Sequence, residues 1–145
     1  MKKLFSLILL TLTTSVLCFA QSNSDDILGV WISETGKAHV RVDKINGQYF
    51  GRIIWLREPI EFGKPKLDKN NSDKIKKTAP MMGLRLLNFF KFDGDGVWNE
   101  GTIYDPENGK TYSCKITMKE KNKLNIRGYI GISLIGRTSI WKRVQ

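Results

Sequence analysis

Polar and apolar residues alternate along several stretches of the chain, and this two-residue period is typical of half-buried β-strands. In the stretch 111–118 the even-numbered residues are apolar and the odd-numbered ones are polar. Residues 123–127 repeat the pattern, and residues 37–43 follow it less regularly. No helical period stands out beyond the first 20 residues. The alternation therefore predicts an all-β domain.

Short clusters rich in Gly, Asn, Asp and Pro separate the alternating stretches, as the turns of β-hairpins require. We expect strands near residues 28–33, 37–45, 48–56, 85–92, 97–104, 110–119, 122–130 and 135–144. Strands joined mostly by hairpins, without a helix to cover a parallel sheet, favour an antiparallel up-and-down arrangement. Closing that sheet into a barrel removes its exposed edges, so we expect a single barrel of about eight strands.

Residues 57–84 interrupt this rhythm with a connection that is long for a compact domain. In the overlapping stretch 64–91, eight basic residues stand against two acidic ones, Asp68 and Asp73. We expect either a flap over one end of the barrel or a solvated basic surface. Residues 72–77 within it allow a single helical turn.

The first 20 residues have the composition of a signal peptide. Lys2 and Lys3 precede an apolar run at residues 4–17, which is short for a membrane span, and Cys18 and Ala20 place small residues before a cleavage site. Cleavage after Ala20 leaves a barrel domain at residues 21–145, which we expect in the periplasm or outside the cell. A lipoprotein anchored at Cys18 is the less favoured alternative, because Leu17 stands where a small residue is expected.

Composition narrows the class of the exported domain. At 41% hydrophobic and 10% aromatic residues, the chain is globular rather than disordered. Loss of the signal lowers the formal charge from +10 to +8 and leaves Cys114 as the one cysteine, so an internal disulfide is excluded. No second apolar stretch has the length of a transmembrane segment.

Few residues are candidates for catalysis. His39 lies mid-strand and is more typical of a surface residue, whereas Cys114 falls on an apolar strand face. One histidine and one cysteine do not supply a usual zinc site, so we expect no catalytic residues, no metal and no cofactor. A hydrolase that uses Glu100 and Asp105 is a minor alternative, because strand parity places these carboxylates on opposite faces.

The aromatic content leaves two possibilities for the barrel interior. An eight-stranded barrel is just wide enough to be filled by its own side chains or to hold one small ligand. Alternation alone does not decide between them. Aromatic and basic residues also interleave at residues 88–92, but export argues against nucleic acid as a partner.

Two residues far apart in the chain resemble the lipocalin arrangement. Gly29-Val30-Trp31 opens the first expected strand, and Arg143 lies in the last. The resemblance implies that Trp31 lies across the barrel floor and that Arg143 packs over it in a cation–π contact, which closes that end.

A more specific resemblance spans nearly the whole exported chain. Residues 47–53, 63–68, 98–112 and 127–143 resemble the bacterial family known as domain of unknown function 2147. This resemblance implies a small exported protein with a lipocalin-like barrel and no established activity. The chain departs from the family pattern at Ala79, where a typical member has an arginine before the proline.

The resemblance and the aromatic content together favour a carrier of a small hydrophobic or amphipathic ligand, such as a fatty acid. We expect Arg127 and Arg137 to pair with its polar head. The expected aromatic contacts are Trp55, Phe90, Trp98, Tyr104, Tyr112 and Tyr129. The alternative is a filled barrel whose basic 64–91 segment binds an anionic polymer, a lipid headgroup or a protein partner of the cell envelope.

Overall fold

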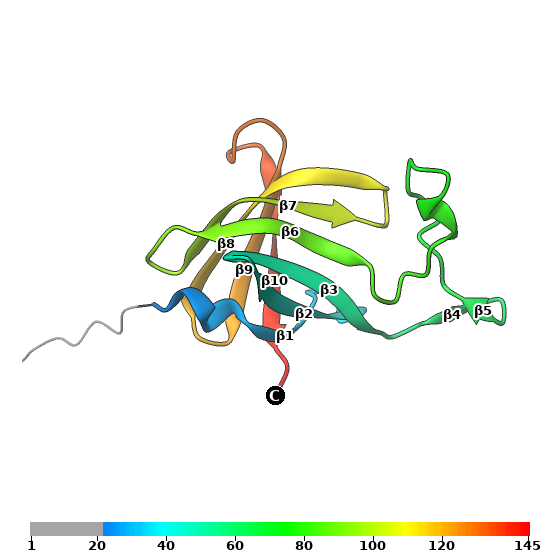
Figure 1. The fold of residues 1–145 in the computed structure, drawn as a ribbon, viewed down its shortest axis with the longest axis horizontal. Helices are drawn as coiled ribbons and strands as arrows, with labels where there is room; N and C mark the ends of the chain where they lie inside the picture. The colour runs from blue at the N-terminus through cyan, green and yellow to red at the C-terminus, as the bar shows by residue number, and fades with distance from the viewer. Residues whose placement is uncertain (1–21) are drawn as a thin grey trace, which may run out of the picture.

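The computed structural model describes residues 22–145, so the predicted signal peptide lies outside the described residues. Within them, eight antiparallel strands form a closed barrel (Figure 1). These strands are β1 (Gly29–Ile32), β2 (Ala38–Ile45), β3 (Gln48–Leu56), β6 (Arg85–Phe92), β7 (Val97–Asp105), β8 (Lys110–Glu120), β9 (Lys123–Tyr129) and β10 (Gly136–Arg143). Each pairs with its neighbours in this list, and β1 closes on β10. The predicted up-and-down barrel is confirmed, and every barrel strand lies within residues 22–145.

The connections alternate between the two ends of the barrel, as antiparallel neighbours require. The β2–β3, β6–β7 and β8–β9 hairpins lie at one end, together with the 3-10 helix η1 (Ser24–Ile27) that precedes β1. The β1–β2, β7–β8 and β9–β10 connections and the long connection from β3 to β6 lie at the opposite end. We call these the closed end and the open end.

Helix η1, which the hydrophobic pattern did not predict, covers the closed end. Its backbone carbonyls accept hydrogen bonds from two indoles: Trp31 Nε1 donates to Ile27 at 2.9 Å, and Trp98 Nε1 donates to Ser24 at 3.1 Å. The Tyr49 hydroxyl donates to the Asp25 carboxylate at 2.8 Å. Three aromatic side chains of the barrel are therefore hydrogen-bonded to η1, which we call the plug.

Large side chains fill the closed half of the barrel. Trp31, Tyr49, Phe90 and Trp98 are the largest fully buried side chains, and Trp98 packs edge-on to Tyr49. The Phe90 ring lies directly against Gly101, where a Cβ atom would overlap it. Gly101 is thus required inside a strand by a close approach, which is one of the few roles that favour glycine there.

Arg143 lies over the Trp31 ring, 4.2 Å from its centroid. Its guanidinium also donates to the Leu28 carbonyl at 2.8 Å and to the Asp26 carbonyl at 2.6 Å. Gly29 has a φ of +122°, and a Cβ there would be 2.8 Å from the Arg143 Nη1 atom. The glycine therefore makes room for the stacking that the lipocalin resemblance implies.

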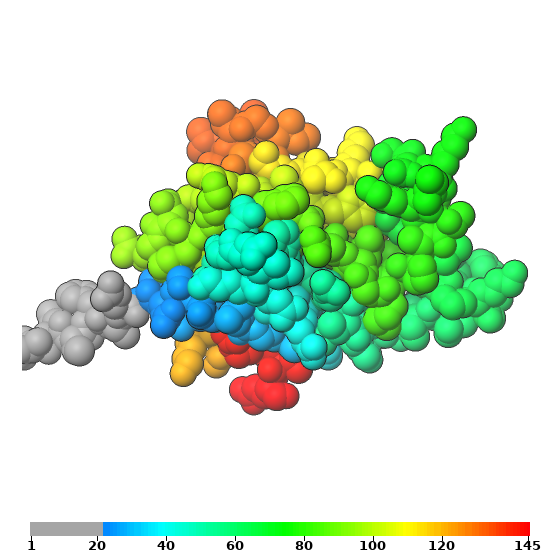
Figure 2. Space-filling model, viewed as in Figure 1, coloured from blue at the N-terminus to red at the C-terminus, as the bar shows by residue number. Residues whose placement is uncertain are grey.

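The long connection between β3 and β6 contains little regular secondary structure. It contains β4 (Ile60–Glu61), β5 (Lys64–Pro65) and η2 (Lys76–Thr78), so the helical turn expected at residues 72–77 lies slightly later in the chain. Figure 2 shows this segment, in green, projecting beyond the barrel. No helix in residues 22–145 is both long and apolar enough to cross a membrane.

Candidate functional site

A cavity of about 880 Å³ occupies the open half of the barrel. Its volume lies within the range of roughly 300–1,000 Å³ that is typical of small-molecule sites. The interior is thus divided, because the closed half is filled by aromatic side chains and the open half is hollow. The sequence left open whether the interior is filled or can hold a small ligand. The first description fits the closed half and the second fits the open half.

Apolar side chains from most of the barrel strands form the inner part of the cavity. They are Ala38, Ile53, Leu56, Leu86, Ile103, Ile126 and Trp141. Gly128 also lines it, and a Cβ there would lie 3.3 Å from Ile103 Cγ2, so the glycine keeps this space free. The one polar group of the Trp141 indole, Nε1, donates to the Ser139 hydroxyl at 3.1 Å. The inner cavity therefore favours an apolar ligand segment.

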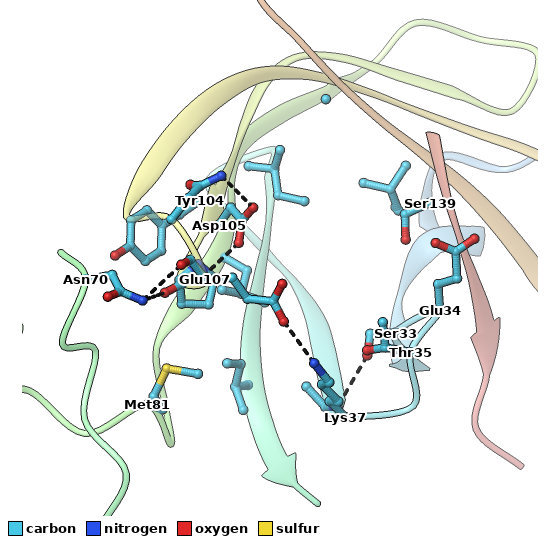
Figure 3. A pocket seen from close by; sticks show the side chains of 18 of the residues that line it. Ser33, Glu34, Thr35, Lys37, Asn70, Met81, Tyr104, Asp105, Glu107 and Ser139 are labelled. Atoms are coloured by element: carbon cyan, nitrogen blue, oxygen red, sulfur yellow. Dashed lines mark hydrogen bonds and ion pairs between the residues drawn. The ribbon is translucent and has the colours of Figure 1, made fainter. Parts of the chain in front are cut away.

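Charged side chains surround the mouth in equal numbers of each sign. Five are basic and five are acidic: Lys37, Arg57, Lys66, Lys69, Arg137, Glu34, Glu58, Glu61, Asp105 and Glu107. Three ion pairs connect members of the two groups: Lys37–Glu107 at 3.1 Å, Lys69–Glu61 at 3.0 Å and Arg137–Glu34 at 3.8 Å. Figure 3 shows Lys37 and Glu107 reaching toward each other from the β1–β2 and β7–β8 hairpins.

A buried carboxylate supports one wall of the cavity. Asp68, in the long connection, is 1% exposed and accepts hydrogen bonds from the Tyr104 hydroxyl at 2.7 Å and from Asn71 Nδ2 at 2.8 Å. Burial of the phenol, followed by its hydrogen bond to Asp68, raises the pKa of Tyr104 to about 12. Tyr104 is therefore a neutral donor over the whole physiological range.

The long connection is held against the β7–β8 hairpin by Asn70. Its side-chain amide donates to the carbonyls of Pro106 and Glu107, each at 3.0 Å (Figure 3). The Asn70 carbonyl in turn lies so close to Gly109 that a Cβ there would overlap it. The hairpin and the connection thus form a single wall of the mouth.

Four of the eight ligand contacts predicted from the sequence lie around the cavity. These are Tyr104, Tyr112, Tyr129 and Arg137. Their part in binding stays a prediction. The position of Tyr104, Tyr112 and Arg137 at the mouth fits contacts to the polar end of a ligand, whereas Tyr129 pairs with Ser113 and also lines an outer-face groove.

Two predicted contacts, Trp55 and Arg127, lie on the outer face. Trp55 is 41% exposed and stacks on His39, with ring centroids 4.4 Å apart. The β2–β3 register shifts beside it, because Ile54 is an extra residue that reverses the alternation of β3. Arg127 donates outward to the carbonyls of Ser133 and Leu134, at 2.6 and 3.2 Å, and so holds the β9–β10 loop.

Phe90 and Trp98 were also wrongly assigned to the cavity, for a different reason. Both point into the barrel, as the sequence predicts, but they lie in the filled closed half. Trp98 is the second residue of β7, directly after a closed-end hairpin. Its depth along the barrel axis therefore excludes contact with a ligand at the open end.

Sequence reasoning missed the aliphatic lining. Ile53, Ile103 and Ile126 lie on the inner faces of three strands, where alternation marks them as inward-facing but gives no reason to prefer them over aromatic residues. The buried state of Asp68 was missed as well. Its one signal was an acidic residue in an otherwise basic segment.

The groups considered for catalysis lie apart. Cys114 is buried, and burial raises the pKa of its thiol to about 12. Glu100 pairs with Lys91 at 2.7 Å on the outer surface, away from Asp105 at the mouth. Within residues 22–145, no group of three or more His, Cys, Asp or Glu side chains is placed to hold a metal ion.

Comparisons with known proteins agree with this architecture. Residues 29–143 match the sequence model of DUF2147, described as an uncharacterized protein conserved in bacteria. Protein HP1028 from the human pathogen Helicobacter pylori, described as belonging to the lipocalin family, superposes with a TM-score of 0.72 at 19% sequence identity. The superposition covers 82% of this chain and 83% of that one. A search among curated protein sequences finds no significant match.

Proposed function

Because the chain belongs to the DUF2147 family of uncharacterised bacterial proteins and folds as a lipocalin-like barrel, we propose that it binds a small amphipathic ligand, such as a fatty acid, in its cavity. The observation that carries the proposal is the half-open interior of about 880 Å³. Its inner part is apolar and its mouth is charged, which matches a ligand with an apolar tail and a polar head.

The polar head of the ligand meets two cations at the mouth. Among the described residues, Arg137 forms an ion pair only with Glu34, at 3.8 Å, and is largely exposed, so it can exchange this partner for a ligand carboxylate. Lys66 also lines the mouth and forms no ion pair among the residues that the structure describes. Arg127, which the sequence analysis favoured, is replaced in this role because it points outward.

We propose a binding protein rather than an enzyme, acting in the periplasm or outside the cell. The position of the candidate catalytic groups supports this: His39 stacks on Trp55 on the outer face, and Cys114 is buried in the core. The apolar run at residues 4–17 supports export.

Native mass spectrometry of the protein purified gently from the periplasm tests the proposal directly. An extra mass that is present under native conditions and lost on denaturation identifies a bound small molecule and gives its size. Titration with a fluorescent fatty acid then measures affinity. An interior that stays empty after exposure to an envelope lipid extract, with no fatty acid binding, contradicts the proposal.

A pair of variants locates the site. Ile103→Phe adds bulk inside the cavity, whereas Thr102→Phe adds the same ring at the neighbouring residue, which faces away from the interior because side chains alternate along β7. We expect at least about fivefold weaker fatty acid binding for Ile103→Phe, since the cost of overpacking is roughly 1–3 kcal/mol. Equal affinities of the two variants would place the ligand elsewhere.

A further inference from the structure

Exposed apolar side chains are concentrated at one end of the molecule. The seven most exposed large ones are Phe62, Leu134, Ile75, Ile130, Ile135, Ile132 and Ile60. All seven lie in the long connection or in the β9–β10 loop, and both of these segments leave the barrel at its open end. Large apolar side chains that are exposed in such number at one end of a barrel favour an interaction site, because exposed apolar residues are usually scattered singly.

Two tips of the long connection present single apolar side chains to solvent. Phe62, at the turn between β4 and β5, is 97% exposed, and Ile75, just before η2, is 83% exposed. The Asp73 carboxylate accepts hydrogen bonds from the backbone N–H groups of Ile75 and Lys76, at 2.8 and 3.3 Å, and these donors hold its pKa below the usual value. This turn is therefore held in a fixed shape with Ile75 pointing outward.

The β9–β10 loop forms a third apolar tip. Residues 130–135 contain no charged side chain, and Leu134 is 85% exposed. Arg127 donates hydrogen bonds to the backbone carbonyls of Ser133 and Leu134. The loop is therefore held in place with its apolar side chains exposed. Figure 2 shows this loop, in orange, and the green long connection as separate projections from the molecule.

Lysines surround the tips of the long connection. Lys64 follows Phe62 by two residues, and Lys74, Lys76 and Lys77 flank Ile75. All four are exposed, and none forms an ion pair among the residues that the structure describes. Apolar side chains that project beyond a ring of lysines match the layers of an anionic bilayer, where acyl chains lie beneath negative headgroups.

The closed end also carries exposed lysines but has no comparable apolar tip. Its hairpin turns, at residues 46–47, 93–96 and 121–122, consist of Gly, Asn, Asp and Lys, and helix η1 carries Asp25 and Asp26. The most exposed large apolar residue of the closed half is Phe89, at 54%, and it lies, like Ile45 at 42%, within a strand rather than at a projecting tip. Within the described residues, the open end therefore presents apolar tips beside its unpaired lysines, whereas the closed end presents lysines without such tips.

We propose that the open end docks on an anionic phospholipid bilayer, with Phe62, Ile75 and Leu134 entering the interface and Lys64, Lys74, Lys76 and Lys77 contacting the headgroups. The docked barrel has its mouth beside the membrane, where amphipathic molecules enter and leave. Docking rests on the surface alone and does not depend on the identity of the ligand.

Co-sedimentation with lipid vesicles tests the proposal. Residues 21–145, the chain expected after cleavage of the signal peptide, are mixed with vesicles of phosphatidylcholine alone or with phosphatidylglycerol added. We expect binding to the anionic vesicles that weakens with salt. Each lysine near a membrane contributes about 1 kcal/mol, so Lys74→Gln, Lys76→Gln and Lys77→Gln together should weaken binding by about a hundredfold.

A second variant tests the apolar tips. Phe62 has a φ of +51°, a conformation that asparagine tolerates, so Phe62→Asn combined with Ile75→Ser removes the apolar groups without added backbone strain. We expect at least about tenfold weaker binding, because a buried Phe or Ile side chain contributes roughly 1.5–3 kcal/mol.

Matched controls lie at or near the closed end. Lys119→Gln, Lys121→Gln and Lys142→Gln together remove the same charge from exposed, unpaired lysines, and Ile45→Ser removes an exposed apolar group. Both controls should bind anionic vesicles as the unmodified protein does. All variants are compared for fatty acid binding without vesicles, and retention of that binding shows that the barrel and the proposed ligand site are intact.

Three results would overturn the docking proposal. One is no binding to anionic vesicles. Another is equal weakening by the closed-end lysine control, which would indicate general charge attraction. The third is lysine-dependent binding that the Phe62 and Ile75 substitutions leave unchanged, which would favour an anionic polymer. Loss of fatty acid binding by Ile103→Phe with vesicle binding retained separates this surface from the cavity.

Discussion

Arg143 combines three interactions at the closed end of the barrel. Its guanidinium stacks on Trp31 and donates to the carbonyls of Asp26, in η1, and of Leu28, between η1 and β1. Hydrogen bonds from a charged donor contribute more than neutral ones do, and a desolvated cation–π contact adds to them. One side chain of the last strand thus fixes the plug that precedes the first.

Replacement of Arg143 by methionine keeps the apolar stem and removes all three interactions. We expect the free energy of unfolding to fall by about 2–4 kcal/mol. Urea unfolding followed by tryptophan fluorescence measures this loss. Arg41→Met, on an exposed outward-facing residue of β2, is the control and should change stability by less than about 0.5 kcal/mol. Equal stability of the two variants would mean that the stacked arginine is dispensable.

Tyr104→Phe removes the donor to buried Asp68. At neutral pH we expect a loss of about 1–3 kcal/mol, because the carboxylate keeps only its bond from Asn71. The folded-state pKa of Tyr104 is raised from 10.0 to about 12, so the unmodified protein loses this contribution as the pH rises from about 10 to 12. The stability gap between the two proteins should therefore narrow over that range.

Urea unfolding at pH 7 and at about pH 11 measures both effects. Tyr129→Phe is the control, because it removes a tyrosine hydroxyl that makes no hydrogen bond within the described part of the chain. A gap that widens with pH would contradict the assigned role of the Tyr104 phenol.

At the scale of elements, the long connection behaves as part of the barrel wall. Its two halves pair through backbone hydrogen bonds, from Asp68 N to Ala79 O at 3.0 Å and from Met81 N to Lys66 O at 2.8 Å. Asn70 then joins it to the β7–β8 hairpin. The length of this segment is explained by its role, because it forms one side of the cavity mouth.

Gly109→Ala should detach this wall. Gly109 has a φ of +72° and its α-carbon faces the Asn70 carbonyl, so alanine adds both backbone strain and a clash. Hydrogen exchange should become faster at residues 66–71 and 79–81 while the barrel strands stay protected. Gly47→Ala, with a φ of +77° and no neighbour within 4 Å, carries the strain without the clash and should leave those residues unchanged. Slow exchange at residues 66–71 and 79–81 in Gly109→Ala would contradict the proposed contact between the long connection and the β7–β8 hairpin.

At the scale of the whole molecule, the filled half gives stability and the open half offers a site. The plug, the buried aromatic residues and the Arg143 stack all lie at the closed end, so the cavity imposes little cost on the core that holds the barrel together. Cavities within a core are destabilising in proportion to their volume. Separation of the two halves along the barrel axis avoids this conflict.

Cys114 reports on opening of the barrel as a unit. The thiol is buried and its pKa is raised to about 12, so a thiol reagent at about pH 8 should react only when the barrel opens. The labelling rate should rise with urea in step with global unfolding. The double variant Ser113→Cys and Cys114→Ala moves the thiol to the exposed face of β8 and should react at once. Rapid labelling of the unmodified protein would contradict a closed barrel.

Much of the fold follows from local patterns in the sequence. Every predicted barrel strand is present, and most boundaries agree within one residue, because alternation and turn residues act over short distances. Helix η1 is the exception: at four residues it is too short to show a period. The inward-facing residues of β8, including Cys114 and Ile116, are likewise correctly identified.

The candidate site was predicted less well than the fold. Arg127 was assigned to the mouth although it falls between the inward-facing residues Ile126 and Gly128, so strand parity already indicated the outer face. Trp55 is different, because a single extra residue in β3 reverses its direction and no local pattern marks that bulge. Strand alternation also does not tell how far along the barrel axis a side chain lies. That distance places Phe90 and Trp98 in the closed half.

The sequence by itself determined the strands, their order, the turns between them and, away from bulges, the residues that face inward, since these depend on neighbours along the chain. Only the tertiary structure decided that the closed half is filled and the open half hollow. That division depends on how side chains from distant strands meet across the barrel, as Trp98 meets Tyr49 and Phe90 meets Gly101. Packing of this kind is a property of volumes in three dimensions, which a one-dimensional pattern does not contain.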